Sequence, residues 1–466
     1  MPALSGKTLK AKVMHAPIRG AVDILDRALV AIGEDGTIAT VHAEGDDGYG
    51  VHEAAAAHAG TLVTTPPDTV LLPGFIDLHI HAPQFPQLGK ALDVPLEVWL
   101  QTHTFPLEAR YADPIFAARV YDALVAALLA NGTTTAVYFG TIHGEANRIL
   151  ARTCLEKGQR ALVGKVAMDN PDECPDYYRD PDADAAIDET RAFIEHVRTL
   201  PGNADGLVRP VITPRFIPSC TDACLDGLGQ VAAETGAAVQ THCSESDWEH
   251  GYVLDRYGRS DTRALDDFGL MTRHTVLAHG ALLTPDDMTL IAARGAGVAH
   301  CPLSNVYFSN AVFPLRRALE KGVRVGLGTD ISGGPSASML DTCRSAIAAS
   351  RLLDEGVDPT VAGDLRGTPD SRIDFREAFH LATAGGADVL DLPVGRIAPG
   401  CRFDAILVDP NAAAAPLFID SGPDGLDTPD DILQKLVMTA TRANIAWTAV
   451  DGRIVSGNPQ DAASFA

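Results

Sequence analysis

Two histidines separated by one residue, His79 and His81, end an apolar stretch that begins at Leu71. Side chains two positions apart lie on the same face of an extended strand, so a strand over residues 75–82 would present both imidazoles together. Neutral imidazole is a common ligand of transition metals. The pair alone would equally suit two structural histidines, and the metal interpretation therefore depends on the rest of the chain.

Further coordinating groups follow other apolar runs, at the positions where strands are expected to end. The predicted ligands of one divalent cation per chain are His79, His81, His242 and Asp330. Imidazole and carboxylate ligands without thiolates suit Zn²⁺, with Fe²⁺ as the alternative. A water on such a cation loses a proton near neutral pH. We expect Glu245 to transfer protons, and His279 to hydrogen-bond the hydroxide or the tetrahedral intermediate.

The elements that position these groups alternate between strands and helices. Eight strands are expected, over residues 75–82, 133–139, 161–169, 208–216, 238–245, 275–280, 297–305 and 323–330. A helical pattern follows each strand, as in 116–131 and 222–235, and a polar and aromatic insertion, 84–114, follows the first strand. Eight such units predict an α/β fold, a (β/α)8 TIM-like barrel. Active sites of this fold lie at the carboxyl ends of the strands, where the candidate residues fall.

The two ends of the chain have a different texture, with short strands and tight turns. We predict that residues 1–70 and 393–466 together form one small β-sheet domain, and that residues 71–392 form the barrel. Chain termini are often close in space, which favours this pairing.

Composition limits the classes of function. The 466 residues are 46% apolar and carry a formal net charge of −24, which disfavours binding to nucleic-acid phosphates. A secretory signal and an apolar run long enough for a membrane span are not expected. The eight cysteines form no CxxC pair and are expected to be reduced residues of a cytoplasmic protein.

At this point the chain resembles the amidohydrolase superfamily, and within it is similar to guanine deaminases. The matching segments are Pro73–Gln84, Val98–Leu100, Thr104–Glu108, Val163–Asp169, Thr213–Phe216, His242–Glu245, Ala278–Gly280, His300–Asn305, Gly326–Gly334 and Ser338–Asp341. The His-x-His, His-x-x-Glu and Thr-Asp parts are typical of the superfamily and its mononuclear deaminases. Three further motifs indicate guanine as the substrate: the Pro-Gln after the second histidine, the Trp-Leu…Thr-Phe-Pro insertion and Pro-Arg-Phe.

The resemblance implies a homodimeric enzyme of purine catabolism that hydrolyses guanine to xanthine and ammonia, a metal-activated water attacking C2 while Glu245 protonates N3. The implied purine contacts are Gln84, Trp99, Leu100, Arg215 and Phe216. Arginine donors match the O6/N7 edge of guanine, and a glutamine amide offers both a donor and an acceptor. The aromatic side chains would stack on the ring or form a wall beside it.

Three alternatives remain open from the residues. The first is a deaminase of another purine, a pterin or a triazine, which only Gln84, Arg215 and the insertion can separate from a guanine enzyme. The second is a dinuclear hydrolase of cyclic amides, with a carboxylated Lys165 as bridging ligand and His279 on a second metal. The third is a non-catalytic scaffold, which would be expected to lose ligands that this chain retains.

Overall fold

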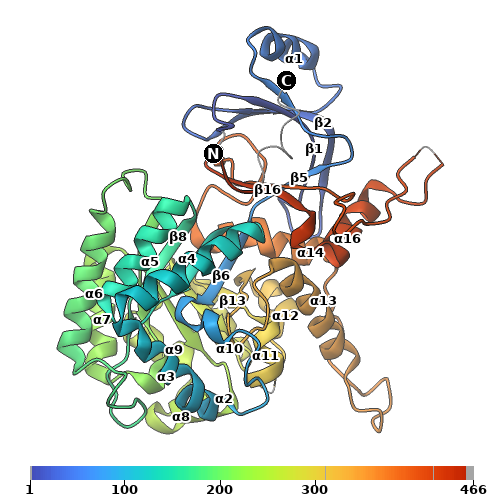
Figure 1. Cartoon of the computed structure of the whole chain (residues 1–466). Helices are drawn as coiled ribbons and strands as arrows, with labels where there is room; N and C mark the ends of the chain where they lie inside the picture. Colours follow the sequence, from blue (N-terminus) through green and yellow to red (C-terminus); the bar gives the residue numbers. More distant parts are fainter. Residues whose placement is uncertain (1–2, 310, 423, 458–466) are drawn as a thin grey trace.

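The computed structural model describes residues 3–309, 311–422 and 424–457, which form a barrel and a smaller β unit that carries both chain ends (Figure 1). The parallel barrel strands, in order around the sheet, are β6 (Phe75–His81), β7 (Thr133–Phe139), β8 (Arg160–Gly164), β10 (Val208–Pro214), β11 (Ala238–Cys243), β12 (Thr275–His279), β13 (Gly297–His300) and β14 (Arg324–Leu327). The chain after β14 returns to β6, because Asp330 N donates to His79 O and His81 N to Ile331 O, both at 2.9 Å. The predicted barrel is confirmed.

Most barrel strands end before their predicted last residue, and the third and the seventh differ most. The third is interrupted at Lys165, and its continuation β9 (Val166–Ala167) pairs only with β10. The seventh ends at His300 and not at Asn305, because α11 (Pro302–Phe308) begins there with proline in its first turn. Proline suits that position since its missing N–H would have no partner in the helix.

Helices surround the strands and begin and end at recognisable signals. They are α4 (Pro114–Ala130), α5 (Gly144–Lys157), α6 (Ala183–Arg198), α7 (Asp222–Thr235), α8 (Asp247–Tyr257), α9 (Asp261–Asp267), α10 (Pro285–Arg294), α12 (Leu315–Glu320), α13 (Met339–Glu355), α14 (Phe375–His380) and α15 (Gly386–Leu390). Thr284 and Asp287 form a reciprocal cap on α10, and Gly295 ends this helix in the left-handed conformation. Among the helices of the described residues, none has the length and apolarity needed to cross a bilayer.

The insertion after the first barrel strand is helical and largely packed. It contains a 3-10 turn (Ala82–Gln87), α2 (Leu96–Trp99), a π turn (Leu100–Thr104), α3 (Phe105–Ala109) and a second 3-10 turn (Arg110–Ala112). Trp99, Phe105 and Glu108 are all buried in it. The segment therefore folds onto the mouth of the barrel.

The second sheet is built from both ends of the chain, as predicted. Its order is β17 (Arg453–Gly457), β16 (Ile445–Val450), β15 (Ala405–Val408), β5 (Val70–Pro73), β1 (Thr8–His15), β2 (Asp23–Ile32) and β3 (Ile38–His42), with β4 (Leu62–Thr64) beside β1. Helix α1 (Tyr49–His58) lies on this unit, at the top of Figure 1. Helix α16 (Pro429–Thr439) instead packs beside α13 and α14, where Asp430 pairs with Arg376.

A buried ion-pair network joins the barrel to the terminal sheet. Arg160, at the start of β8, donates from Nε to Asp404 Oδ2 at 2.9 Å and from Nη2 to Asp451 Oδ1 at 2.6 Å. The Asp404 side chain is fully buried. The carboxylates raise the pKa of Arg160 above its usual value, although burial acts in the opposite direction.

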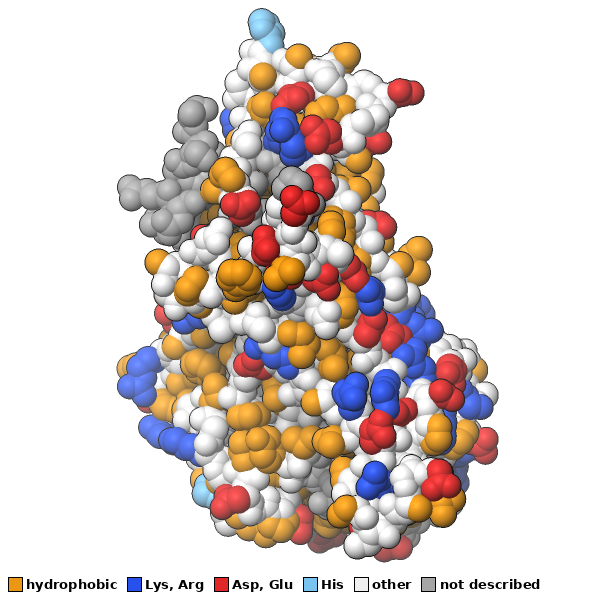
Figure 2. Space-filling view, turned by 90° about the vertical axis from the view of Figure 1, so that its right-hand side faces the viewer, with side chains coloured by type: hydrophobic (Ala, Val, Ile, Leu, Met, Phe, Trp, Pro, Cys, Tyr) orange, Lys and Arg blue, Asp and Glu red, His pale blue; other side chains and the backbone are white. Residues whose placement is uncertain are grey.

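The end of α13 and the segment after it project from the barrel as an arm (Figure 1). Its apolar side chains Val357 and Leu365 are 72% and 78% exposed. Figure 2 views this side of the molecule and shows hydrophobic side chains gathered on the broader barrel half, below the narrower terminal β unit.

Candidate active site

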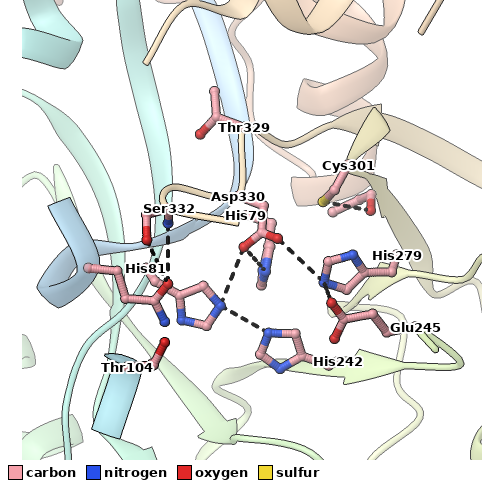
Figure 3. Close-up of polar contacts among 12 residues, drawn as sticks. His79, His81, Thr104, His242, Glu245, His279, Cys301, Thr329, Asp330 and Ser332 are labelled. Carbon is pink, nitrogen blue, oxygen red and sulfur yellow. Dashed lines mark hydrogen bonds and ion pairs between the residues drawn. The ribbon is translucent and has the colours of Figure 1, made fainter. Parts of the chain in front are cut away.

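Three imidazoles and one carboxylate meet at the carboxyl end of the barrel (Figure 3). His79 and His81 are the last inward-facing residues of β6, His242 lies near the end of β11, and Asp330 follows β14. Asp330 Oδ1 lies 3.2 Å from His79 Nε2 and 3.5 Å from His81 Nε2. His81 Nε2 is 3.0 Å from His242 Nε2. The four predicted metal ligands therefore surround one point.

The protonation of this cluster fits a bound cation. His242 Nδ1 is 2.6 Å from the backbone oxygen of Arg215, so its proton lies on Nδ1 and its Nε2 lone pair faces the cluster. Burial lowers the pKa of His79, His81 and His242 well below the usual value, which favours neutral imidazole. His79 Nε2 has no hydrogen-bond partner in the described chain, although it is buried. Neutral nitrogens converging on a carboxylate are a suitable donor set for Zn²⁺.

Glu245 and His279 lie at the edge of the same cluster. His279 Nε2 is 3.6 Å from Glu245 Oε1 and 3.9 Å from Asp330 Oδ2. Burial raises the pKa of Glu245 well above its usual range, and the charge of Asp330 adds to the effect. Burial also raises the pKa of Asp330. A carboxyl group with a raised pKa beside a candidate metal site is suited to proton transfer.

The backbone at two of these positions is left-handed without glycine. His279 has a φ of 72° and Asp330 a φ of 49°. Such residues are uncommon, and they cluster at functional sites where the surrounding structure holds them in place. Here the turn directs both side chains from their strand ends into the cluster.

Two buried polar residues that we did not predict from sequence support the cluster. Asp77 accepts from Thr329 N at 2.9 Å and from Thr329 Oγ1 at 2.5 Å, which joins the first barrel strand to the segment that follows the last one. Burial raises its pKa to about 7. Asn305 Oδ1 lies 3.0 Å from His279 Nδ1, so the imidazole proton lies on Nδ1 and Nε2 is an acceptor. Asp77 sits two residues before His79, a sequence signal for a same-face partner.

A small cavity opens beside the cluster. All five predicted purine contacts line it, namely Gln84, Trp99, Leu100, Arg215 and Phe216. Its wall also includes Leu96, Ser304 and Phe308, which we did not predict. The mixture of apolar walls with a few polar groups is typical of small-molecule sites.

The two polar purine candidates share a buried partner for which we predicted no role. Arg215 and Gln84 both donate to Glu108, which lies on α3 of the insertion. Burial acts to lower the pKa of Arg215, but the Glu108 carboxylate raises it above its usual value. The available signal was an acidic residue directly after the Thr-Phe-Pro-Leu run of the insertion.

The residue proposed to bridge two metals is engaged elsewhere. Lys165 Nζ lies 2.5 Å from Asp180 Oδ1, and the lysine side chain is fully buried. Asp180 also accepts from Met168 N at 2.9 Å. An amine held in this ion pair is not free to form a bridging carbamate, which argues against the dinuclear alternative.

Comparison with known proteins extends over both parts of the fold. Residues 70–455 match the model of the amidohydrolase family. The chain is 37% identical over 388 residues to guanine deaminase of Mus musculus, with 82% of each chain covered. It is 34% identical over 465 residues to guanine deaminase of Dictyostelium discoideum, covering 96% of this chain and 97% of that one. The crystal structure of guanine deaminase from C. acetobutylicum, with guanine bound in its active site, matches with a TM-score of 0.85 and 27% identity, covering 97% and 100% of the chains.

Proposed function

The chain belongs to the amidohydrolase family, and on this premise we propose that it hydrolyses guanine to xanthine and ammonia. One observation carries the proposal: the buried amide of Gln84 and the buried guanidinium of Arg215 line a cavity whose wall also includes His81, His242, Glu245 and Asp330. A purine in this cavity would lie between its recognition groups and the groups that can activate water. The similarity to guanine deaminases over nearly the whole chain supports the same substrate.

The purine contacts have complementary roles. Arg215 supplies fixed N–H donors for the O6/N7 edge of guanine, and Gln84 supplies one donor and one acceptor for the remaining polar edge. Trp99, Leu100 and Phe216 enclose the faces and rim of the ring. The apolar wall also excludes bulk water, which strengthens the polar contacts.

The metal ligands in this proposal are His79, His81, His242 and Asp330, which hold one Zn²⁺ per chain, with Fe²⁺ as the alternative. A bound cation of this kind supplies Lewis acidity and lowers the pKa of a coordinated water. The backbone oxygen of Arg215 orients His242 through Nδ1. The fit of the donor set is the support for this assignment.

Glu245 transfers protons during hydrolysis, and His279 hydrogen-bonds the intermediate. Glu245, with Asp330, takes a proton from the attacking water and delivers it to N3 as oxygen adds to C2. His279 Nε2 accepts a hydrogen bond from the hydroxyl on the tetrahedral carbon. As the tetrahedral intermediate collapses, Glu245 takes the proton of the C2 hydroxyl and passes it to the 2-amino group. The C2–N bond breaks, ammonia leaves and a carbonyl forms at C2, so guanine and water give xanthine and ammonia.

The purified protein tests this function directly. We expect ammonia release from guanine with equal formation of xanthine, and turnover of adenine, cytosine and pterins that is lower by orders of magnitude in kcat/KM. The measurement is a coupled ammonia assay with chromatographic identification of the product. Preferred turnover of a pterin or of adenine would reject guanine as the substrate while retaining a deaminase.

We also propose that the enzyme is a cytoplasmic homodimer that acts on a free base in purine breakdown. The exposed apolar arm after α13 is a candidate contact between subunits. Light scattering should give about twice the chain mass of 49.1 kDa. Leu365→Asp should shift the mass towards the monomer, whereas Ile18→Asp, an exposed apolar residue on the terminal β unit, should not. A monomeric wild-type protein would contradict this assignment.

A further inference from the structure

We propose that Glu108 is a positioning residue that fixes Arg215 and Gln84 together, and that it thereby makes the cavity selective for a purine with a carbonyl oxygen at position 6. The inference rests on the proposed guanine activity and assigns the origin of its selectivity. Glu108 is fully buried on α3 and is not among the residues that line the cavity. It therefore acts through its two partners.

Both carboxylate oxygens of Glu108 are engaged as acceptors. Oε2 accepts from Arg215 Nη1 at 2.6 Å, and Oε1 accepts from Arg215 Nη2 at 3.3 Å. Oε1 also accepts from Gln84 Nε2 at 2.9 Å. A bidentate arginine–carboxylate pair fixes the plane of the guanidinium as well as its position.

The contact with Glu108 also fixes which way the Gln84 amide is turned. Its Nε2 faces the carboxylate, and its Oε1 faces Ser332 N at 3.2 Å on the opposite side. Turning the amide over would place an oxygen against the carboxylate and an NH₂ group against a backbone N–H. The Ser332 hydroxyl is a second, longer contact of the same oxygen, at 3.5 Å, and Gln84 Nε2 keeps one free N–H to offer a ligand.

Glu108 also compensates the charge of Arg215. Arg215 is 2% exposed, and an unpaired charge at this depth would be strongly unfavourable. The carbon of the guanidinium lies 5.0 Å from the centre of the Phe105 ring, which supports it from another side. Three of its five N–H groups remain after the two bonds to Glu108.

The result is a rigid set of donors beside the cavity. A carbonyl oxygen at position 6 of a purine can accept from such a set, whereas a hydrogen or an amino group at this position cannot. A buried donor without a partner is costly, so a rigid site rejects the wrong group more strongly than a mobile one. Selectivity at position 6 should depend on Glu108, although Glu108 itself does not reach the ligand.

Glu108→Gln tests the inference because an amide has one acceptor where the site needs two. Whichever way it is turned, its NH₂ group faces a donor of Arg215 or Gln84. We expect kcat/KM for guanine to fall about 10- to 100-fold, mainly through KM. The preference for guanine over 2-aminopurine, which has hydrogen in place of O6, should fall at least about 10-fold. Metal content should not change.

Two further variants separate selectivity from loss of structure. Glu108→Asp keeps both acceptors but is one methylene shorter, and it should also reduce the preference for guanine. Asp404→Asn removes a partner of another buried arginine, Arg160, in the network between barrel and sheet. It should lower thermal stability and leave the ratio of the two substrates as in the wild type.

The inference is overturned if either Glu108 variant, folded and loaded with metal, keeps the wild-type ratio of guanine to 2-aminopurine. An equal loss for both substrates would also overturn it, since a purely structural role predicts that result. Ammonia release by the wild-type protein decides the proposed function separately. If the wild type acts on guanine and the ratio does not move, only the role of Glu108 is wrong.

Discussion

Glu245→Gln is expected to lower kcat for guanine by about 10³-fold while the protein retains its metal. Glutamine has nearly the same shape but cannot carry a proton between the attacking water, N3 and the leaving amine. Burial already raises the pKa of this carboxyl group, as proton transfer near neutral pH requires. Steady-state kinetics with guanine, together with metal analysis of the same preparation, measures both parts of the prediction.

Glu377→Gln is a matched control for this experiment. Glu377 is 8% exposed and pairs with Arg316, away from the cavity, so the same chemical change should leave kcat unaltered. Full turnover by a metal-loaded Glu245→Gln protein would reject the proton-transfer role. Loss of metal from this variant would instead indicate that Glu245 is itself a metal ligand, and the four proposed ligands would have to be revised.

Removal of the metal by a chelator should abolish ammonia release, and added Zn²⁺ should restore it. Without a cation, His79, His81 and His242 present nitrogen lone pairs to each other in a buried site. Metal analysis should find one ion per chain. The holoprotein should also be more stable, by about 2.7 kcal/mol when free metal is 100-fold above its dissociation constant.

The ligand assignment has its own test. His242→Ala should reduce metal occupancy and abolish activity. His274 is an exposed histidine directly before β12, at the end of that strand away from the active site, and His274→Ala should change neither property. Two ions per chain at saturation would revive the dinuclear alternative. Full activity after complete removal of metal would reject metal-dependent hydrolysis.

Much of the barrel could be predicted because its strands are buried on both faces. Parallel strands of this kind appear in sequence as continuous apolar runs, as in Thr133–Phe139, whose bounds were predicted correctly. The errors fall where a strand passes into the active-site loops. At Lys165 the run continues in sequence, but the ladder breaks, and the lysine turns to Asp180. Local patterns do not contain that partner, which lies in a loop before α6.

Helix α16 was missed although a local signal was present. Thr428 and Asp431 form a reciprocal cap, with proline in the first turn between them. The Gly-, Pro- and Asp-rich residues before this helix favoured an interpretation of the whole segment as turns. The insertion after β6 was more difficult, because its short helical turns have no sustained period and are held by packing on the barrel.

In the candidate site, too, some residues could be predicted from the sequence and others could not. Histidines and acids at strand ends could be found from sequence because barrel topology brings strand ends together. Glu108 could not be assigned, since its importance arises from two contacts, with Arg215 and Gln84, that are 107 and 24 residues away. Asn305 likewise acts only through His279.

The location of the recognition groups has an evolutionary consequence. Gln84, Trp99, Leu100 and Glu108 come from one segment of the chain, residues 82–112, whereas Arg215, Phe216, the histidines and Asp330 belong to the barrel rim. Replacement of this segment during evolution could change which heterocycle the enzyme accepts, while the residues that carry out hydrolysis stay the same. Grafting the segment between related enzymes is accordingly a natural route for redesigning which ring they accept.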